Sequence, residues 1–219
     1  MKTKAVIFDL DGTLMDTLGD ISAGVSFALQ QQGRAIPTLA QYRTYIGDGP
    51  KVLLQRALGQ DVSAETFSSL YDCYFDYYCR HPAVYTCVYP QILPVLQVCR
   101  DAGLPMAVNT NKQQVLAELL IKEKLSGFSF SAIVGQQENR PLKPDPAGAL
   151  QIAEILSVSP EDILFVGDSF QDVLTADHAG MTPLSVLWGY QSEETIRSNG
   201  GRYFYRDGVS LRDAIVGGI

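Results

Sequence analysis

The chain has 219 residues, of which 46% are hydrophobic and 19% are charged, a composition typical of globular proteins and not of disordered or collagen-like chains. Its formal net charge is −7 and its lysines and arginines do not cluster, which argues against binding to nucleic acid or to an anionic membrane. This length suits one core domain with a modest insertion. We therefore expect one site that acts on a small molecule.

Cysteine and histidine usage bears on the kind of metal and on the compartment. None of the four cysteines belongs to a C-x-x-C pair, and the only histidines are His81 and His178. A zinc site and disulfides are therefore disfavoured, and neither histidine is assigned a catalytic role. The apolar stretch at residues 5–8 ends at Asp9, too early for a signal peptide or a membrane span. We expect a cytoplasmic protein.

The first apolar run, residues 5–8, predicts a buried strand. From residue 16 to residue 85 the sequence shows helical patterns and no convincing strand. This predicts an inserted helical cap domain at 16–85 and a catalytic core made of residues 1–15 and 86–219. One predicted cap helix, residues 64–81, carries four aromatic side chains on one face: Tyr71, Tyr74, Phe75 and Tyr78. We interpret that face as packing within the cap and assign it no role in ligand binding.

Beyond the cap, apolar runs alternate with helical patterns. The predicted strands are residues 106–108, 132–134, 163–166 and 184–187. The predicted helices are residues 93–102, 113–124 and 146–156. Because the apolar runs are continuous and do not alternate with polar residues, they are typical of parallel strands buried on both faces. We expect an α/β fold, a Rossmann-like parallel sheet with helices on both faces, plus the all-helical cap.

Polar residues that follow the predicted strands are the candidates for chemistry, since open parallel sheets bind ligands beyond the carboxyl ends of their strands. Asp9 and Asp11 follow the first strand, where two neighbouring carboxylates need a cation or a proton. Thr110 and Asn111 follow the second strand and could either hold phosphate oxygens or cap the next helix. Both interpretations of this second cluster remain open.

Two later segments add a positive charge and further acids. Lys143 lies in the segment L-K-P-D-P, whose prolines stiffen the backbone before a helix. Asp168 follows the fourth strand directly, whereas Asp172 falls in the first turn of the next helix, where an acid also favours the helix dipole. The strand-end carboxylates are the hard oxygen ligands that Mg²⁺ prefers, and Lys143 supplies charge for a phosphate.

Four motifs in order resemble the haloacid dehalogenase-like hydrolase superfamily: D-x-D-G-T at 9–13, T-N-K at 110–112, K-P-x-P at 143–146 and G-D-x-x-x-D at 167–172. The resemblance spans essentially the whole chain, and the helical insertion resembles the small cap of that family. Dehalogenases of the superfamily lack the second aspartate of the first motif, so Asp11 favours phosphate chemistry. The resemblance therefore implies a phosphoric monoester hydrolase.

The resemblance also implies a role for each motif residue. Asp9 would be the nucleophile that becomes phosphorylated, and Asp11 would protonate the leaving oxygen and later activate water. A Mg²⁺ cofactor would bind Asp9, the backbone carbonyl of Asp11 and Asp168, while Asp172 would order its outer shell. The implied substrate-binding residues are Thr110, Asn111 and Lys143. Lys143 would also be catalytic, because its charge restrains the Asp9 carboxylate.

Within the superfamily, residues 45–49, 53–58 and 108–112 look most like phosphoglycolate phosphatases. Gln91 and Asn109 depart from the pattern of that group and leave the substrate open, and an acid at Asp48 is awkward beside a carboxylate substrate. The alternatives are a β-phosphoglucomutase-like phosphosugar mutase, a pyrophosphatase or sugar-phosphate phosphatase of the same superfamily and, least favoured, a binding module without turnover. The expected partner is a small phosphorylated metabolite, with no nucleic acid or membrane, and the chain is expected to be a monomer or a homodimer.

Overall fold

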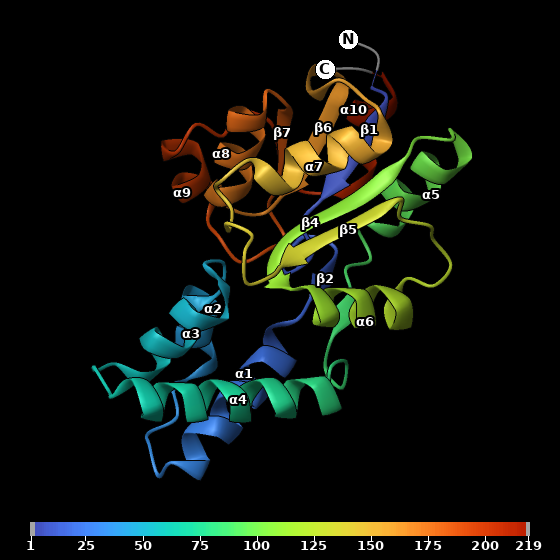
Figure 1. The fold of residues 1–219 in the computed structure, drawn as a ribbon. Helices are drawn as coiled ribbons and strands as arrows, with labels where there is room; N and C mark the ends of the chain where they lie inside the picture. Colours follow the sequence, from blue (N-terminus) through green and yellow to red (C-terminus); the bar gives the residue numbers. More distant parts are fainter. Residues whose placement is uncertain (1–2, 218–219) are drawn as a thin grey trace.

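A computed structural model describes residues 3–217 and places a six-stranded parallel sheet at the centre of the fold (Figure 1). The strands are β1 (Ala5–Phe8), β4 (Met106–Gln113), β5 (Ala132–Gln136), β6 (Ile163–Gly167), β7 (Thr182–Val186) and β8 (Phe204–Tyr205). Their order is β5-β4-β1-β6-β7-β8, and each neighbouring pair is parallel. The predicted α/β class is confirmed.

Strand β1 lies in the middle of the sheet because all of its side chains are apolar and fully buried. It pairs with β4 on one side and β6 on the other, so Phe8 lies level with Val108 and Val166. The chain adds β4 and β5 on one side of β1 before it adds β6, β7 and β8 on the other. The carboxyl end of β1 is therefore the switch point at which sheets of this kind bind ligands.

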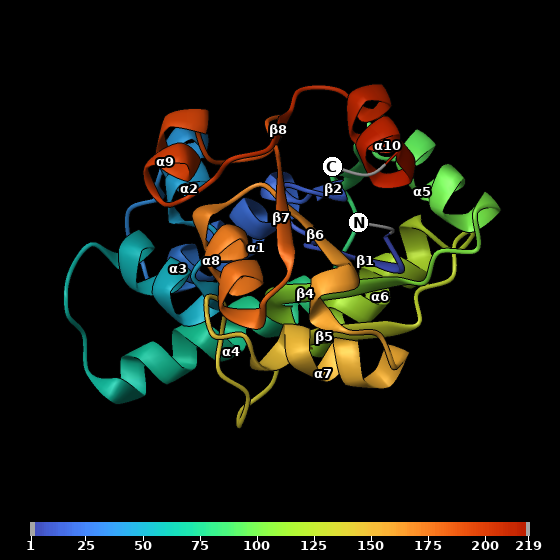
Figure 2. The ribbon, with the colours of Figure 1, turned by 90° about the horizontal axis from the view of Figure 1, so that it is seen from above.

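Alternate side chains of β1 face opposite sides of the sheet, and helices cover both sides. Val6 and Phe8 pack in one hydrophobic cluster with α5 (Leu93–Asp101), α6 (Gln114–Lys124) and α10 (Gly208–Gly217). Ala5 and Ile7 pack in a second cluster with α7 (Ala147–Leu156) and α8 (Phe170–Ala179). Figure 2 shows α5 and α10 side by side on their face of the sheet.

The remaining elements of the core are short. They are a 3₁₀ turn (Pro160–Asp162), helix α9 (Glu193–Ser198) and an antiparallel pair formed by β2 (Met15–Asp16) and β3 (Cys87–Val88). The sequence did not predict β2, β3 or β8, because two residues are too few to show a hydrophobic period. Among residues 3–217, no helix combines the length and the apolar character that a bilayer crossing requires.

The segment between β2 and β3 is helical, as predicted, and forms a hydrophobic cluster of its own below the sheet (Figure 1). Its helices are α1 (Leu18–Gln31), α2 (Leu39–Tyr45), α3 (Gly49–Leu58) and α4 (Ala64–Arg80). Tyr74 and Tyr78 are buried in this cluster, and Tyr71 and Phe75 pack against it. We call α1 to α4 the cap; the domain division at residues 16–85 stays a prediction.

The two chain crossings between core and cap are joined by Asp20, a buried acid in the first turn of α1. Its carboxylate accepts hydrogen bonds from the backbone N–H groups of Val84, Tyr85 and Thr86 and from the Thr86 hydroxyl, at 2.6–3.1 Å. These donors satisfy both carboxylate oxygens away from water. The start of α1 and the segment after α4 are thus held together at the base of the cap.

Candidate active site

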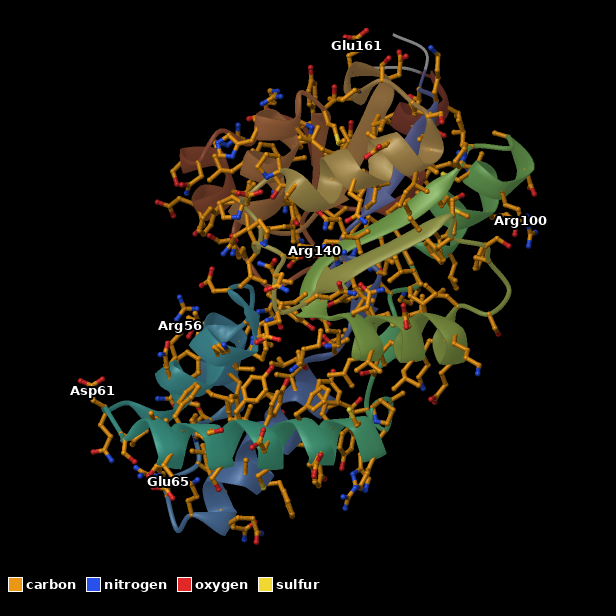
Figure 3. The ribbon with its side chains drawn as sticks, in the orientation of Figure 1. Arg56, Asp61, Glu65, Arg100, Arg140 and Glu161 are labelled. Carbon is orange, nitrogen blue, oxygen red and sulfur yellow. The ribbon has the colours of Figure 1, made fainter. Side chains whose placement is uncertain are left out.

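A cavity lies between the carboxyl ends of the strands and the cap, where side chains from both parts meet (Figure 3). Most of the predicted site residues line it: Asp9, Asp11, Thr110, Asn111, Lys143 and Asp168. The cap contributes mainly apolar residues, among them Ile21, Ile46, Leu53 and Tyr74. The structure thus brings together residues from four segments of the sequence, and it gives Tyr74 a place in the cavity wall that the sequence interpretation did not assign.

Asp9 occupies the first position beyond β1, where its N–H donates to the carbonyl of Val166 on the neighbouring strand. The residue is only 7% exposed, and the Lys143 ammonium lies 2.8 Å from Asp9 Oδ1. Within residues 3–217 this oxygen accepts no well-aligned hydrogen bond. Burial raises the pKa of Asp9 to about 7, although the charge of Lys143 acts in the opposite direction.

Lys143 precedes α7 and is held by the side chain of Asn111. Asn111 Oδ1 accepts from Lys143 N at 2.8 Å, and Asn111 Nδ2 donates to Lys143 O at 3.2 Å and to Gly47 O at 2.9 Å. The Lys143 ammonium also lies 2.5 Å from Asp172 Oδ1. Asn111 therefore positions the lysine backbone and joins it to the cap turn at Gly47.

Asp168 follows β6 and is almost fully buried. Its carboxylate accepts from Thr13 Oγ1 at 3.1 Å and from Tyr190 N at 2.7 Å, and burial raises its pKa well above the ordinary value. A Cβ at Gly12, which has φ +87°, would lie 2.3 Å from Asp168 Oδ2. The glycine of D-x-D-G-T is thus required both by its backbone conformation and by the approach of this acid.

Asp172 serves the helix and the acid cluster at once. It is the third residue of α8, where it forms a capping box with Ser169. Asp172 Oδ1 accepts a hydrogen bond from the Lys143 ammonium. Asp9, Asp168 and Asp172 each offer a carboxylate oxygen, and these oxygens lie within 4.8 Å of one another. Lys143 pairs with two of these three buried acids, Asp9 and Asp172, so the cluster keeps negative charge that a divalent cation would neutralise.

Comparisons with known proteins show the family of the chain. The sequence model of a haloacid dehalogenase-like hydrolase matches residues 3–180. The chain belongs to this family. A phosphoglycolate phosphatase of Neisseria gonorrhoeae is 33% identical over 220 residues, covering 99% of this chain and 90% of the relative. Phosphoglycolate phosphatase 1 of Pseudomonas aeruginosa is 35% identical over 192 residues, covering 85% and 70%.

Solved structures of similar proteins share the fold of this hydrolase over nearly its full length. The structure of a provisionally named phosphoglycolate phosphatase from Lactobacillus delbrueckii superposes with a TM-score of 0.92. The two sequences are 27% identical, and the match covers 100% of each chain. A predicted phosphoglycolate phosphatase of Haemophilus somnus has a TM-score of 0.87 and 26% identity, covering 96% of this chain and 97% of that one. The relation to the family therefore extends over cap and core together.

In this hydrolase, β4 extends to Gln113, beyond the predicted end at residue 108. Its pairing with β5 shifts register between Asn109 and Gln113. The first residue of α6 is Gln114, so neither Thr110 nor Asn111 caps that helix, and the helix-cap interpretation is wrong. Thr110 lines the cavity instead. Polar residues in T-N-K concealed the strand because sequence patterns identify strands by their apolar side chains.

The irregular end of β4 brings in Lys112, which the sequence analysis left without a role. Its ammonium lies 2.9 Å from Asp11 Oδ1, 3.2 Å from Asp11 Oδ2 and 4.7 Å from the centre of the Tyr78 ring. Asp11 Oδ1 also accepts from Thr17 Oγ1 at 2.6 Å. The Asp11 carboxylate thus faces Lys112 and the cap, apart from the three clustered acids. The lysine of the T-N-K motif is the sequence feature that could have pointed to this contact.

The cap turn between α2 and α3 contacts the core around the cavity. Asp48 lies in this turn, but its carboxylate contacts Arg56 at 2.6 Å and accepts from Gln171 Nε2 at 2.7 Å. Its charge is therefore neutralised, which removes the difficulty that the sequence raised for a carboxylate substrate. On the same side, Arg43 donates to the carbonyl of Gly189.

Proposed function

We propose that this hydrolase is a Mg²⁺-dependent phosphatase of a small phosphomonoester, with 2-phosphoglycolate as the first substrate to test. One observation carries the proposal: the Asp9 carboxylate lines the cavity with Oδ1 buried beside Lys143, close to the acids Asp168 and Asp172. A carboxylate held in this way at a cavity wall is suited to attack an electrophilic phosphorus. The relatives named phosphoglycolate phosphatase support the choice of substrate.

In the proposed reaction, an oxygen of Asp9 attacks phosphorus, and the bond between phosphorus and the ester oxygen breaks. Asp11 gives its proton to the leaving oxygen, and the alcohol departs. Water then attacks the aspartyl phosphate; Asp11 takes a proton from that water, and phosphate and the Asp9 carboxylate are regenerated. Lys143 holds Asp9 and offsets its charge, while Thr110 lies where its hydroxyl can contact the phosphoryl group.

The residues at this end of the sheet fit a magnesium ion, since its preferred ligands are carboxylate and carbonyl oxygens. Asp9, Asp168 and the backbone carbonyl of Asp11 would hold it, and Asp172 would order its surroundings. When bound, the ion would neutralise the phosphate and polarise its oxygens. Without a cation, burial raises the pKa of Asp168, because the ionised carboxylate lacks a compensating positive charge.

The test is a panel of phosphate esters assayed with and without Mg²⁺, using the wild type and Asp9→Asn. We expect phosphate release that requires Mg²⁺ and is lost in the variant, whereas Asp213→Asn, an exposed change in α10, keeps full activity. Full activity in Asp9→Asn would contradict the mechanism. Conversion of β-glucose 1-phosphate to the 6-phosphate without phosphate release would instead identify a mutase, and tight binding without turnover would identify a binding module.

A further inference from the structure

Two of the residues that line the cavity are cationic, Lys112 and Lys143. Lys143 is already committed, because its ammonium lies 2.8 Å from Asp9 and 2.5 Å from Asp172. Lys112 lies near the end of β4, where its side chain is 4% exposed and contacts a single acid within residues 3–217, Asp11. A buried ammonium that faces a cavity can bind an anion of the ligand.

The position of Lys112 is defined by its contact with Asp11. Its ammonium lies 2.9 Å from Asp11 Oδ1, and Asp11 is the residue that we propose protonates the leaving oxygen. A leaving oxygen that accepts this proton would lie roughly 2.7 Å from the Asp11 carboxyl group. A ligand group that contacts both residues must therefore sit only one or two bonds from the ester oxygen.

We infer that Lys112 binds a carboxylate of the substrate, so that the site selects phosphomonoesters with an acid group on the carbon next to the ester oxygen. The inference rests on the proposed phosphatase function and deepens it. Without substrate, the Lys112 ammonium contacts the Asp11 carboxylate. In the complex, the ammonium would contact the substrate carboxylate as well. A single ammonium matches a single carboxylate, whereas a second phosphate would need more positive charge than this side of the cavity offers.

The rest of this side of the cavity agrees with a short acid and disagrees with a sugar. The cap residues that face it are apolar, including Ile21, Ile46 and Leu53. Sugar hydroxyls placed against these side chains would lose hydrogen bonds to water without replacement. Asp48 does not oppose a carboxylate, because Arg56 neutralises it.

The test compares two substrates of equal size, 2-phosphoglycolate and its neutral amide, carbamoylmethyl phosphate. We expect the wild type to prefer the carboxylate in kcat/KM by roughly 100-fold, and Lys112→Met to lose roughly that factor on the carboxylate alone. A loss that acts through Asp11, which Lys112 contacts at 2.9 Å, would be common to both substrates, so the readout is the ratio of the two kcat/KM values in each protein. Lys112→Arg should keep part of the preference because it keeps the charge. Lys122→Met, an exposed change on α6, is the control.

The outcomes separate this inference from the function on which it rests. Equal losses on both substrates in Lys112→Met would overturn it, since the lysine would then act only through Asp11. A wild type that hydrolyses the amide as well as the acid would also overturn it but would leave the phosphatase standing. Failure of the wild type to hydrolyse either ester would overturn the proposed function itself.

Discussion

Lys143 and Asp9 form a buried ion pair in which Nζ lies 2.8 Å from Oδ1. The same ammonium lies 2.5 Å from Asp172, so one cation serves two carboxylates. Burial lowers the pKa of Lys143, but these two acids outweigh it and raise the pKa above the ordinary value. The lysine is therefore charged whenever the site is folded.

Removal of that charge should destabilise the fold as well as abolish activity. Lys143→Met leaves two buried acids without their cation. We expect the free energy of unfolding, measured in urea, to fall by about 3–5 kcal/mol relative to the wild type. Asp9 already has a pKa of about 7, above its unfolded value, and in the variant it loses the opposing charge of Lys143. The folded variant therefore binds more protons than the unfolded chain and regains stability as the pH falls. Lys4→Met, which breaks an exposed pair with Asp162, should cost at most about 1 kcal/mol. Equal losses in the two variants would contradict this prediction.

Binding of Mg²⁺ should be coupled to proton release from Asp9. Burial raises the pKa of this acid to about 7, and the metal requires the ionised form. Below pH 7 protons compete with the metal, so the apparent affinity should fall by up to about tenfold per pH unit. Calorimetry in buffers of different ionisation enthalpy should detect protons released at pH 6 and few at pH 8.5. An affinity that does not change between these values would argue against the prediction.

A methyl group at Gly189 should disturb the acid cluster without touching the reacting atoms. A Cβ there would lie 2.3 Å from Asp168 Oδ2, so this carboxylate must move. We expect Gly189→Ala to lower kcat roughly 10- to 100-fold, because displacements of about 1 Å in an active site have effects of that size. The Mg²⁺ concentration required for half-maximal activity should rise. Gly127→Ala, where nothing lies within 4 Å, should behave as the wild type.

Asp20 should stabilise the base of the cap through its charge. Asp20→Asn keeps the size of the side chain but turns one acceptor oxygen into a donor that faces other donors, including Thr86 N and Oγ1. We expect a loss of about 2–3 kcal/mol in the free energy of unfolding, together with faster hydrogen exchange at residues 84–86. Asp61→Asn, at the far end of the cap (Figure 3), should change neither measurement. Unchanged exchange at 84–86 would refute this role.

The cysteines should differ sharply in reactivity. Burial raises the pKa of Cys99 to about 12, so at pH 8 its thiol is protonated as well as inaccessible. Cys87 is exposed in β3. We expect a thiol reagent at pH 8 to label Cys87 in the native protein and Cys99 only after denaturation, as read by peptide mass spectrometry. Rapid native labelling of Cys99 would show that the α5 face of the core opens readily.

The sequence predicted the sheet well because its strands are uniformly apolar. Residues 5–8 and 163–166 correspond closely to β1 and β6, which are buried on both faces. The prediction failed at β4, which continues through the polar residues of T-N-K to Gln113. Those residues stay in the strand because neighbouring segments satisfy them, as Asn111 is satisfied by Lys143 and Gly47. Contacts of this kind are between segments distant in the chain and leave no period in the sequence.

The candidate site divides in the same way. The acids and the lysine could be named from the sequence because charged residues at the ends of apolar strands are costly without a purpose. Their catalytic roles stay a prediction. The sequence did not reveal Lys112, Tyr74 or the neutralisation of Asp48 by Arg56, since each depends on how the cap meets the core.

By itself, the sequence determined which chemical groups this hydrolase has and at which strand ends they stand, because hydrophobic patterns and motifs are local properties of the chain. Only the tertiary structure decided which groups share a partner: Lys143 joins Asp9 to Asp172, and Lys112 faces Asp11. Electrostatic effects depend on distance and burial, and a fold assigns both only when distant segments pack together.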